Sequence, residues 1–189
     1  MLDAAGRVAR WPGGIDGEMG GNSMRKSTLA MVAFGTAAIL AVGGAFAMAD
    51  APQHVKARLN GYAEVPANST TGNGGFEATI DGNSIDYRLE YGDLEGGDVL
   101  FAHIHLGRRA TNGGVAAFLC GGGGKPVCPQ SGTVEGTIVA ADVVGPATQG
   151  LDVGEFRELV RAIRRHATYV NVHTEVFPGG EIRGNVIES

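Results

Sequence analysis

Apolar and polar residues alternate in short runs from His54 onward, and turn-forming residues separate the runs. A period of two is typical of β-strands that bury one face. The clearest case is a hairpin in which residues 76–80 and 85–91 flank the turn sequence Asp81-Gly82-Asn83. Further strands are expected near residues 54–59, 99–106, 115–119, 132–140, 168–176 and 181–187. The pattern therefore predicts a mainly β fold, an antiparallel Greek-key sandwich or flattened barrel of about eight strands.

One segment has a helical period instead. Apolar residues recur there at positions i, i+3, i+4 and i+7, namely Phe156, Leu159, Val160 and Ile163. Asp152 and Glu155 stand three residues apart, as in a capping box, so the helix is expected to begin next to Asp152. The prediction is a single short helix beside the sheet.

Histidine occupies two of the expected strands, which is an unusual place for imidazole. Because side chains alternate between the faces of a strand, His103 and His105 point to the same side. The opposite side of that strand carries Leu100, Ala102, Ile104 and Leu106. In the later strand the apolar side carries Val170, Val172 and Val176, and the polar side carries Tyr169, Asn171, His173 and Glu175. If the two strands are neighbours in the sheet, three imidazoles converge.

Three imidazoles from two strands can hold one transition metal ion, because residues i and i+2 of a strand are about 7 Å apart and their rings can tilt together. Three histidines with an open position are a zinc ligand set, and copper also accepts imidazole readily. The sequence therefore predicts a copper or zinc site at His103, His105 and His173. Candidates for supporting the ligands are Asn171, Glu175 and Glu181.

A second interpretation needs no metal. The same imidazoles can form a buried hydrogen-bonded network with Tyr169, Asn171 and Thr174. If a metal does bind, its affinity is expected to fall as the pH drops through about 6.5, where protons compete for imidazole. The other two histidines, His54 and His166, are expected to lie on the surface.

Charge narrows the choice of partners. The chain has 15 Lys and Arg, 20 Asp and Glu, and a formal net charge of −5 at pH 7. A negative protein repels the phosphate backbone, so nucleic acid is not expected as a partner. No basic amphipathic helix indicates binding to an anionic membrane either. An unknown protein or a cell-surface component is the expected partner.

The beginning of the chain resembles a secretory signal. Met24-Arg25-Lys26-Ser27 precedes an almost uncharged apolar run over residues 29–48, and Ala47-Met48-Ala49 fits a signal peptidase site. We expect residues 24–49 to be a signal peptide, residues 1–23 to be an upstream extension from a misassigned start, and residues 50–189 to be one domain in a secreted or periplasmic protein. The alternative is an uncleaved membrane anchor, since about 20 apolar residues can cross a bilayer. After removal of the signal, no stable membrane insertion is expected.

Both cysteines, Cys120 and Cys128, lie close together and enclose the segment Gly121-Gly122-Gly123-Gly124-Lys125-Pro126-Val127. Export to an oxidising compartment and a short flexible loop favour a disulfide between them. The alternative is a pair of metal ligands, although thiolate sites usually use three or four cysteines. The four glycines are interpreted as slack inside the disulfide loop, because no helix with Gly-Lys-Ser/Thr follows to form a phosphate site.

Four segments together resemble the CHRD domain, a family named for chordin. They are Leu59-Asn60-Gly61-Tyr62-Ala63-Glu64-Val65-Pro66, Phe101-Ala102-His103-Ile104-His105-Leu106-Gly107, Tyr169-Val170-Asn171-Val172-His173-Thr174 and Phe177-Pro178-Gly179-Gly180-Glu181-Ile182-Arg183-Gly184. The resemblance runs from about Val55 to Ile187. It implies a secreted or cell-surface β-rich module, found in chordin, which antagonises bone morphogenetic proteins, and in many exported bacterial proteins. It implies no settled chemistry.

Two functions are consistent with these features. The first is an exported CHRD-like binding or structural module that holds one transition metal through three histidines. The second is a small copper- or zinc-dependent enzyme, superoxide dismutase-like or hydratase-like, that uses the same histidines. A His-x-His strand in an exported barrel is similar to copper-zinc superoxide dismutase, but that family uses more histidines than the five present here. No other catalytic motif is visible, so an enzyme is the less favoured interpretation.

Overall fold

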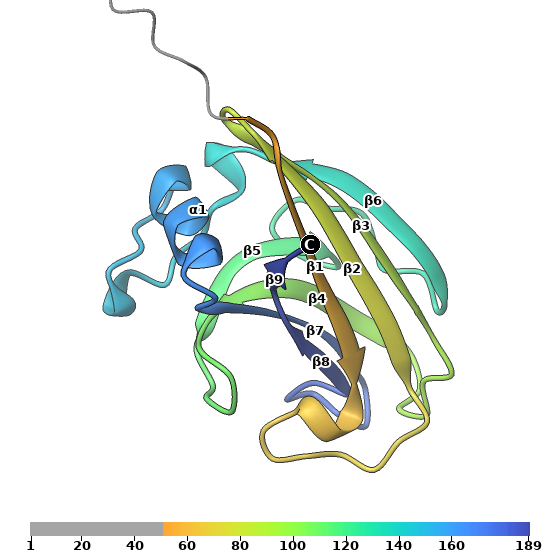
Figure 1. The fold of residues 1–189 in the computed structure, drawn as a ribbon. Helices are drawn as coiled ribbons and strands as arrows, with labels where there is room; N and C mark the ends of the chain where they lie inside the picture. The colour runs from red at the N-terminus through yellow and green to blue at the C-terminus, as the bar shows by residue number, and fades with distance from the viewer. Residues whose placement is uncertain (1–50) are drawn as a thin grey trace, which may run out of the picture. The chain divides into compact units, whose positions relative to one another are not determined.

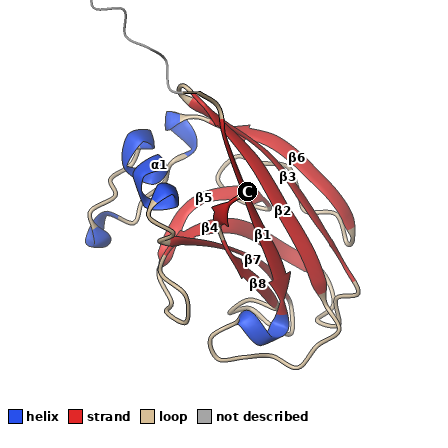
Figure 2. Ribbon diagram, in the orientation of Figure 1, coloured by secondary structure: helices blue, strands red, loops and turns tan. Residues whose placement is uncertain are grey.

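The computed structural model describes residues 51–189, so the predicted signal peptide and upstream extension lie outside the described residues. The strands are β1 (Gln53–Asn60), β2 (Asn73–Asp81), β3 (Ser84–Gly92), β4 (Val99–Leu106), β5 (Gly114–Cys120), β6 (Gly132–Ile138), β7 (Thr168–Thr174), β8 (Ile182–Asn185) and β9 (Ile187–Glu188). One α-helix, α1 (Phe156–Arg164), and three short 3₁₀ helices, η1 (Gly61–Ala63), η2 (Ala140–Asp142) and η3 (Ala147–Gln149), complete the described part (Figure 2).

The strands form one antiparallel sheet in the order β5-β4-β7-β8-β1-β2-β3-β6, and β9 pairs with β1. The sheet curves strongly (Figure 1), and a side chain of β3 reaches across to its far edge, β5. There the Tyr87 hydroxyl of β3 donates a hydrogen bond to the Leu119 carbonyl of β5 at 2.7 Å. The result is a nearly closed barrel, which confirms the mainly β fold of about eight strands with one helix.

The concave side of the sheet encloses the hydrophobic core, as the alternating pattern predicts. The largest fully buried apolar side chains come from most strands, from α1 and from the segment before α1: Phe76, Ile85, Leu89, Ile104, Leu119, Ile138, Leu151, Leu159 and Ile182. The helix starts later than the sequence suggests, at Phe156. Instead of capping it, Asp152 donates its backbone N–H to the Glu155 carboxylate at 2.9 Å and closes a turn in front of the helix. Within residues 51–189, no helix combines the length and hydropathy that a membrane crossing requires.

A β-bulge at the start of β4 changes the expected phase of that strand. Val99 pairs with Thr174, but Phe101 pairs with His173, so one extra residue, Leu100, is accommodated between them. Leu100 is therefore only half-buried, and Val99 takes its place in the core. On β7, Val176 was expected on the apolar side, but the strand ends at Thr174 and Val176 is 66% exposed. Phe101 follows the bulge, keeps the phase of His103 and His105, and lies on the same side of β4.

Cys120 and Cys128 form the expected disulfide. The glycine-rich segment between them is not slack, because it packs closely against an aromatic ring. A Cβ on Gly122 would stand 2.5 Å from the Phe118 ring, and one on Gly123 would stand 2.8 Å from it. Glycine is needed here for close contact, and the loop holds Phe118 in position beside the histidines.

Candidate metal centre

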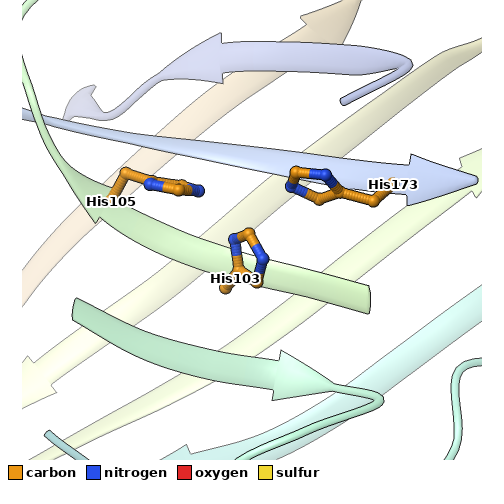
Figure 3. Close-up of side chains that lie close together, drawn as sticks. All are labelled: His103, His105 and His173. Carbon is orange, nitrogen blue, oxygen red and sulfur yellow. The ribbon is translucent and has the colours of Figure 1, made fainter. Parts of the chain in front are cut away.

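The three strand histidines lie together, His103 and His105 on β4 and His173 on the neighbouring β7 (Figure 3). The ring centroids of His103 and His173 are 4.4 Å apart, and those of His103 and His105 are 4.5 Å apart. One nitrogen from each ring lies within 4.8 Å of the others. Figure 3 shows the rings of His105 and His173 pointing toward each other, with the ring of His103 beside them. The strand phase and neighbour relation inferred from the sequence therefore place these residues correctly.

These rings lie on the convex side of the sheet, yet they are buried. His103, His105 and His173 are 5%, 8% and 7% exposed. Two loops, residues 107–113 and 175–181, provide the carbonyl groups that contact the histidines, and the segment after β1 ties both loops down. Asn68 donates to the Gly180 carbonyl at 2.7 Å, and Asn112 donates to the Val65 carbonyl at 3.0 Å. The loops thus create a second, polar interior outside the barrel.

Backbone carbonyls fix the orientation of two rings. His105 Nδ1 lies 2.8 Å from the Gly113 carbonyl, and His173 Nδ1 lies 2.9 Å from the Pro178 carbonyl. A carbonyl only accepts hydrogen bonds, so each Nδ1 carries the hydrogen and each Nε2 is left with a free lone pair. Both Nε2 atoms, and Nδ1 of His103, are buried without a hydrogen-bond partner among the described residues. A carbonyl behind a ring with a free lone pair in front is the usual arrangement of a metal-binding histidine.

The rings are held in the neutral form that binds metals. Burial lowers the pKa of His103 from 6.5 to about 2, with His173 and His105 adding to the effect. Burial also lowers the pKa of His105 to about 4 and lowers the pKa of His173. Protons therefore compete with a metal at a lower pH than the 6.5 expected from an isolated imidazole.

The metal-free network predicted as the alternative lacks two of its three partners. The Thr174 hydroxyl donates to the Glu181 carboxylate at 2.8 Å instead of contacting an imidazole. The Tyr169 hydroxyl accepts from the Gly113 backbone N–H at 3.3 Å. Asn171 remains, opposite His103 in the β4–β7 register. Of the three suggested partners, only Asn171 has a side chain whose polar group interacts with the imidazoles, and it raises the pKa of His103 and His105 against the effect of burial.

Of the three residues that the sequence suggested as supports for the ligands, one lies at the site and two do not. Asn171 is buried between β4 and β8, opposite both His103 and Arg183. Glu175 is exposed on the loop after β7. Glu181 is fully buried, but its carboxylate accepts from the backbone N–H groups of Glu95 and Gly96 at 2.7 and 3.0 Å and so supports another loop.

Arg183 supports His105, a role that the sequence reasoning missed. Its guanidinium carbon lies 3.3 Å from the centroid of the Tyr169 ring, and that ring stacks on His105 with a centroid distance of 4.6 Å. Arg183 also donates to the Thr111 and Arg108 carbonyls at 2.6 and 3.2 Å. It therefore holds the loop whose Gly113 carbonyl orients His105. The available signal was a charged residue, Arg183, directly after the apolar Ile182 in an expected strand.

We expect Arg183→Lys to weaken metal binding about 10- to 100-fold, the effect of losing an outer support of a ligand. Lysine keeps the charge but lacks the planar fork that holds two carbonyls. Calorimetric titration measures the affinity, and the nuclear magnetic resonance signal of the His105 Nδ1–H reports whether the ring has lost its fixed partner. Arg58→Lys, at an exposed position of β1, is the matched control. An affinity within about threefold of the unmodified protein would show that Arg183 does not position His105.

A buried carboxyl group next to the site belongs to Glu64, the residue that follows η1. Its side chain is 6% exposed, and burial raises its pKa to about 7 although the positive charge of Arg183 opposes the shift. Gly180 allows this carboxylate to approach the second interior, because a Cβ there would stand 2.3 Å from Glu64 Oε1 and 2.7 Å from Asn171 Nδ2. The Glu64 carboxylate therefore interacts both with the charge of Arg183 and with the side chain of Asn171, which lies beside the histidines.

Two phenylalanines form an apolar wall beside the imidazoles. The Phe101 ring is stacked against His103 and lies edge-on to His173, with centroid distances of 6.4 and 6.5 Å. The Phe118 ring meets His103 edge-on at 5.2 Å. The remaining histidines lie elsewhere: His54 is exposed with Nδ1 3.0 Å from the Thr79 hydroxyl, and His166 is exposed after α1. Their expected surface positions are confirmed.

The sequence model of one protein family, described as the CHRD domain, matches residues 55–186. This range contains all three clustered histidines and most of the described residues. The comparisons with curated proteins and with solved structures found no significant match.

Proposed function

Because the chain belongs to the CHRD domain family, we propose that it is an exported binding or structural module that holds one copper or zinc ion through His103, His105 and His173. One observation carries the metal site: three neutral imidazole nitrogens are buried together without hydrogen-bond donors. Leaving buried polar atoms unpaired is unfavourable, and a cation would pair with all three lone pairs at once.

The distances support this proposal. Metal–nitrogen bonds are about 2 Å long, so two nitrogens on one ion are at most about 4 Å apart. The three nitrogens here lie within 4.8 Å of one another, and closing the difference requires small rotations of the rings. The carbonyls of Gly113 and Pro178 stay in place during such rotations, because they lie behind the rings.

The disulfide between Cys120 and Cys128 supports a secreted or periplasmic location, where thiols are oxidised. A protein or cell-surface partner is consistent with the family and with the net charge of −5, which disfavours nucleic acid. The enzyme alternative stays a prediction from the sequence. No observation on residues 51–189 favours superoxide dismutase-like or hydratase-like chemistry, so the binding module is the function that we propose.

Calorimetric titration of the tag-free protein with Cu²⁺ and with Zn²⁺ tests the metal site. We expect one ion per chain, and at least about 100-fold weaker binding by His103→Ala, because the lone pair of a buried ligand is lost. His54→Ala, which removes an exposed histidine, should bind like the unmodified protein. Equally weak uptake by the unmodified protein and by His103→Ala would refute the site.

A further inference from the structure

We propose that the three-histidine centre selects monovalent copper over divalent zinc and divalent copper. This inference rests on the proposed metal site and specifies the ion that the site takes. Three features of the structure carry it: a neutral ligand set, a buried arginine next to a ligand, and two phenylalanine rings beside the ligands.

The ligand set brings no negative charge. The cluster of candidate ligands consists of His103, His105 and His173 and includes no carboxylate. The carboxylate of Glu181 already accepts hydrogen bonds from Glu95, Gly96 and Thr174 and is not part of this cluster. An ion at this site therefore keeps its full charge in a buried environment. The electrostatic cost of burying an ion rises with the square of its charge, so a monovalent ion is favoured.

A fixed cation adds to this preference. Arg183 is fully buried and separated from His105 only by the Tyr169 ring on which both stack. Burial is the main cause of the lowered pKa of His105, and the positive charge of Arg183 contributes to it. The charge of Arg183 is thus felt at the ligand, and it repels a divalent ion twice as strongly as a monovalent one. Burial raises the pKa of Glu64 to about 7, so this carboxyl is partly protonated at neutral pH and does not fully cancel the charge of Arg183.

The aromatic wall disfavours the coordination that zinc needs. Zinc is almost always four-coordinate in proteins, and its fourth ligand at a three-histidine site is water or substrate. Phe101 and Phe118 flank His103 and supply no oxygen or nitrogen atom. Copper(I) is a soft ion that is stable with three ligands, and the faces of aromatic rings attract cations. These two side chains therefore offer no fourth ligand, which zinc requires and copper(I) does not.

Competition against chelators of known affinity tests this selectivity on the tag-free, disulfide-bonded protein. We expect copper(I), measured without oxygen, to bind at least about 100-fold more tightly than zinc(II) and at least about 10-fold more tightly than copper(II). If zinc(II) or copper(II) binds as tightly as copper(I), and His103→Ala still abolishes binding, the selectivity is wrong while the metal site stands. If none of the three ions binds with one-to-one stoichiometry, both proposals fail.

Phe101→Glu tests the charge argument separately. Phe101 is 40% exposed, so a polar side chain can replace it without unfolding the core. The new carboxylate should shift the preference toward divalent ions by at least about tenfold, because it supplies the missing negative charge. Phe101→Gln, which removes the ring and adds no charge, is the matched control and should shift the preference less. Equal shifts in the two variants would overturn the charge argument.

Discussion

Metal-free protein is expected to lose about 2 kcal/mol of unfolding free energy when the pH falls from 7 to 5. The cause is the burial of His103 and His105, whose pKa values fall from 6.5 to about 2 and about 4. In the unfolded chain both imidazoles take up a proton near pH 6.5, whereas in the folded protein they stay neutral at pH 5. Acid therefore favours the unfolded state by about 2 kcal/mol for each of these two groups, and the lowered pKa of His173 acts in the same direction.

Glu64 acts in the opposite direction. Burial raises its pKa from 4.5 to about 7, so the folded protein binds a proton between pH 7 and 5 that the unfolded chain binds only at lower pH. This group contributes stability that is present below pH 4.5 and lost as the pH rises through 7, worth about 2 kcal/mol between pH 7 and 5. It cancels about half of the loss from the two histidines.

Urea unfolding in the presence of a metal chelator, at pH 7 and at pH 5, measures this balance. In Glu64→Gln the compensating group is gone, so the loss between the two pH values should rise to about 4 kcal/mol. Glu175→Gln, at an exposed carboxylate, should behave like the unmodified protein. Stability that is equal at both pH values in Glu64→Gln would mean that the imidazoles are not held neutral in the folded protein.

Replacing Glu181 with leucine is expected to lower the free energy of unfolding by about 3 to 5 kcal/mol. The carboxylate is 0% exposed and accepts hydrogen bonds from the Glu95 and Gly96 backbone N–H groups and from the Thr174 hydroxyl. Leucine leaves the Gly96 N–H and the Thr174 hydroxyl buried without an acceptor, at about 1 to 3 kcal/mol each, and it also removes the partner of the half-buried Glu95 N–H. The side chain thus ties the loop before β4 to the end of β7.

Chemical denaturation at pH 7 measures this cost, with Glu175→Leu as the control at an exposed position on the same loop. The control should change stability by less than about 0.5 kcal/mol. Glu181→Gln keeps one carbonyl oxygen and should lie between the two. If Glu181→Leu is within about 1 kcal/mol of the unmodified protein, the three hydrogen bonds do not hold the loop.

Local pattern was sufficient to predict the strands and the face on which the histidines lie. The alternation of His103 and His105 with Ala102 and Ile104 fixes their side of β4, and the structure keeps that phase. The bulge at Leu100 could not be predicted, because it depends on how β4 pairs with β7, more than 60 residues away. Alternation in the sequence indicates on which face of the strand a side chain lies, but it does not indicate where a bulge shifts the pairing register.

The burial of the histidines under loops could not be predicted from the sequence pattern. A polar strand face is normally solvated, but here loops that start and end on different strands cover it. Arg183 and Tyr169 meet because β7 and β8 pair, and Glu64 approaches them from the segment after η1, so separation along the chain hides these contacts. For the same reason Glu181 was expected near the imidazoles, although its carboxylate turns to the opposite side of the loop.

X-ray absorption of the one-to-one copper complex tests most directly whether the three imidazoles bind one ion together. We predict three imidazole nitrogens at about 2 Å from copper in the unmodified protein and two in His173→Ala. A spectrum without imidazole scattering, or one that His173→Ala leaves unchanged, would contradict the account.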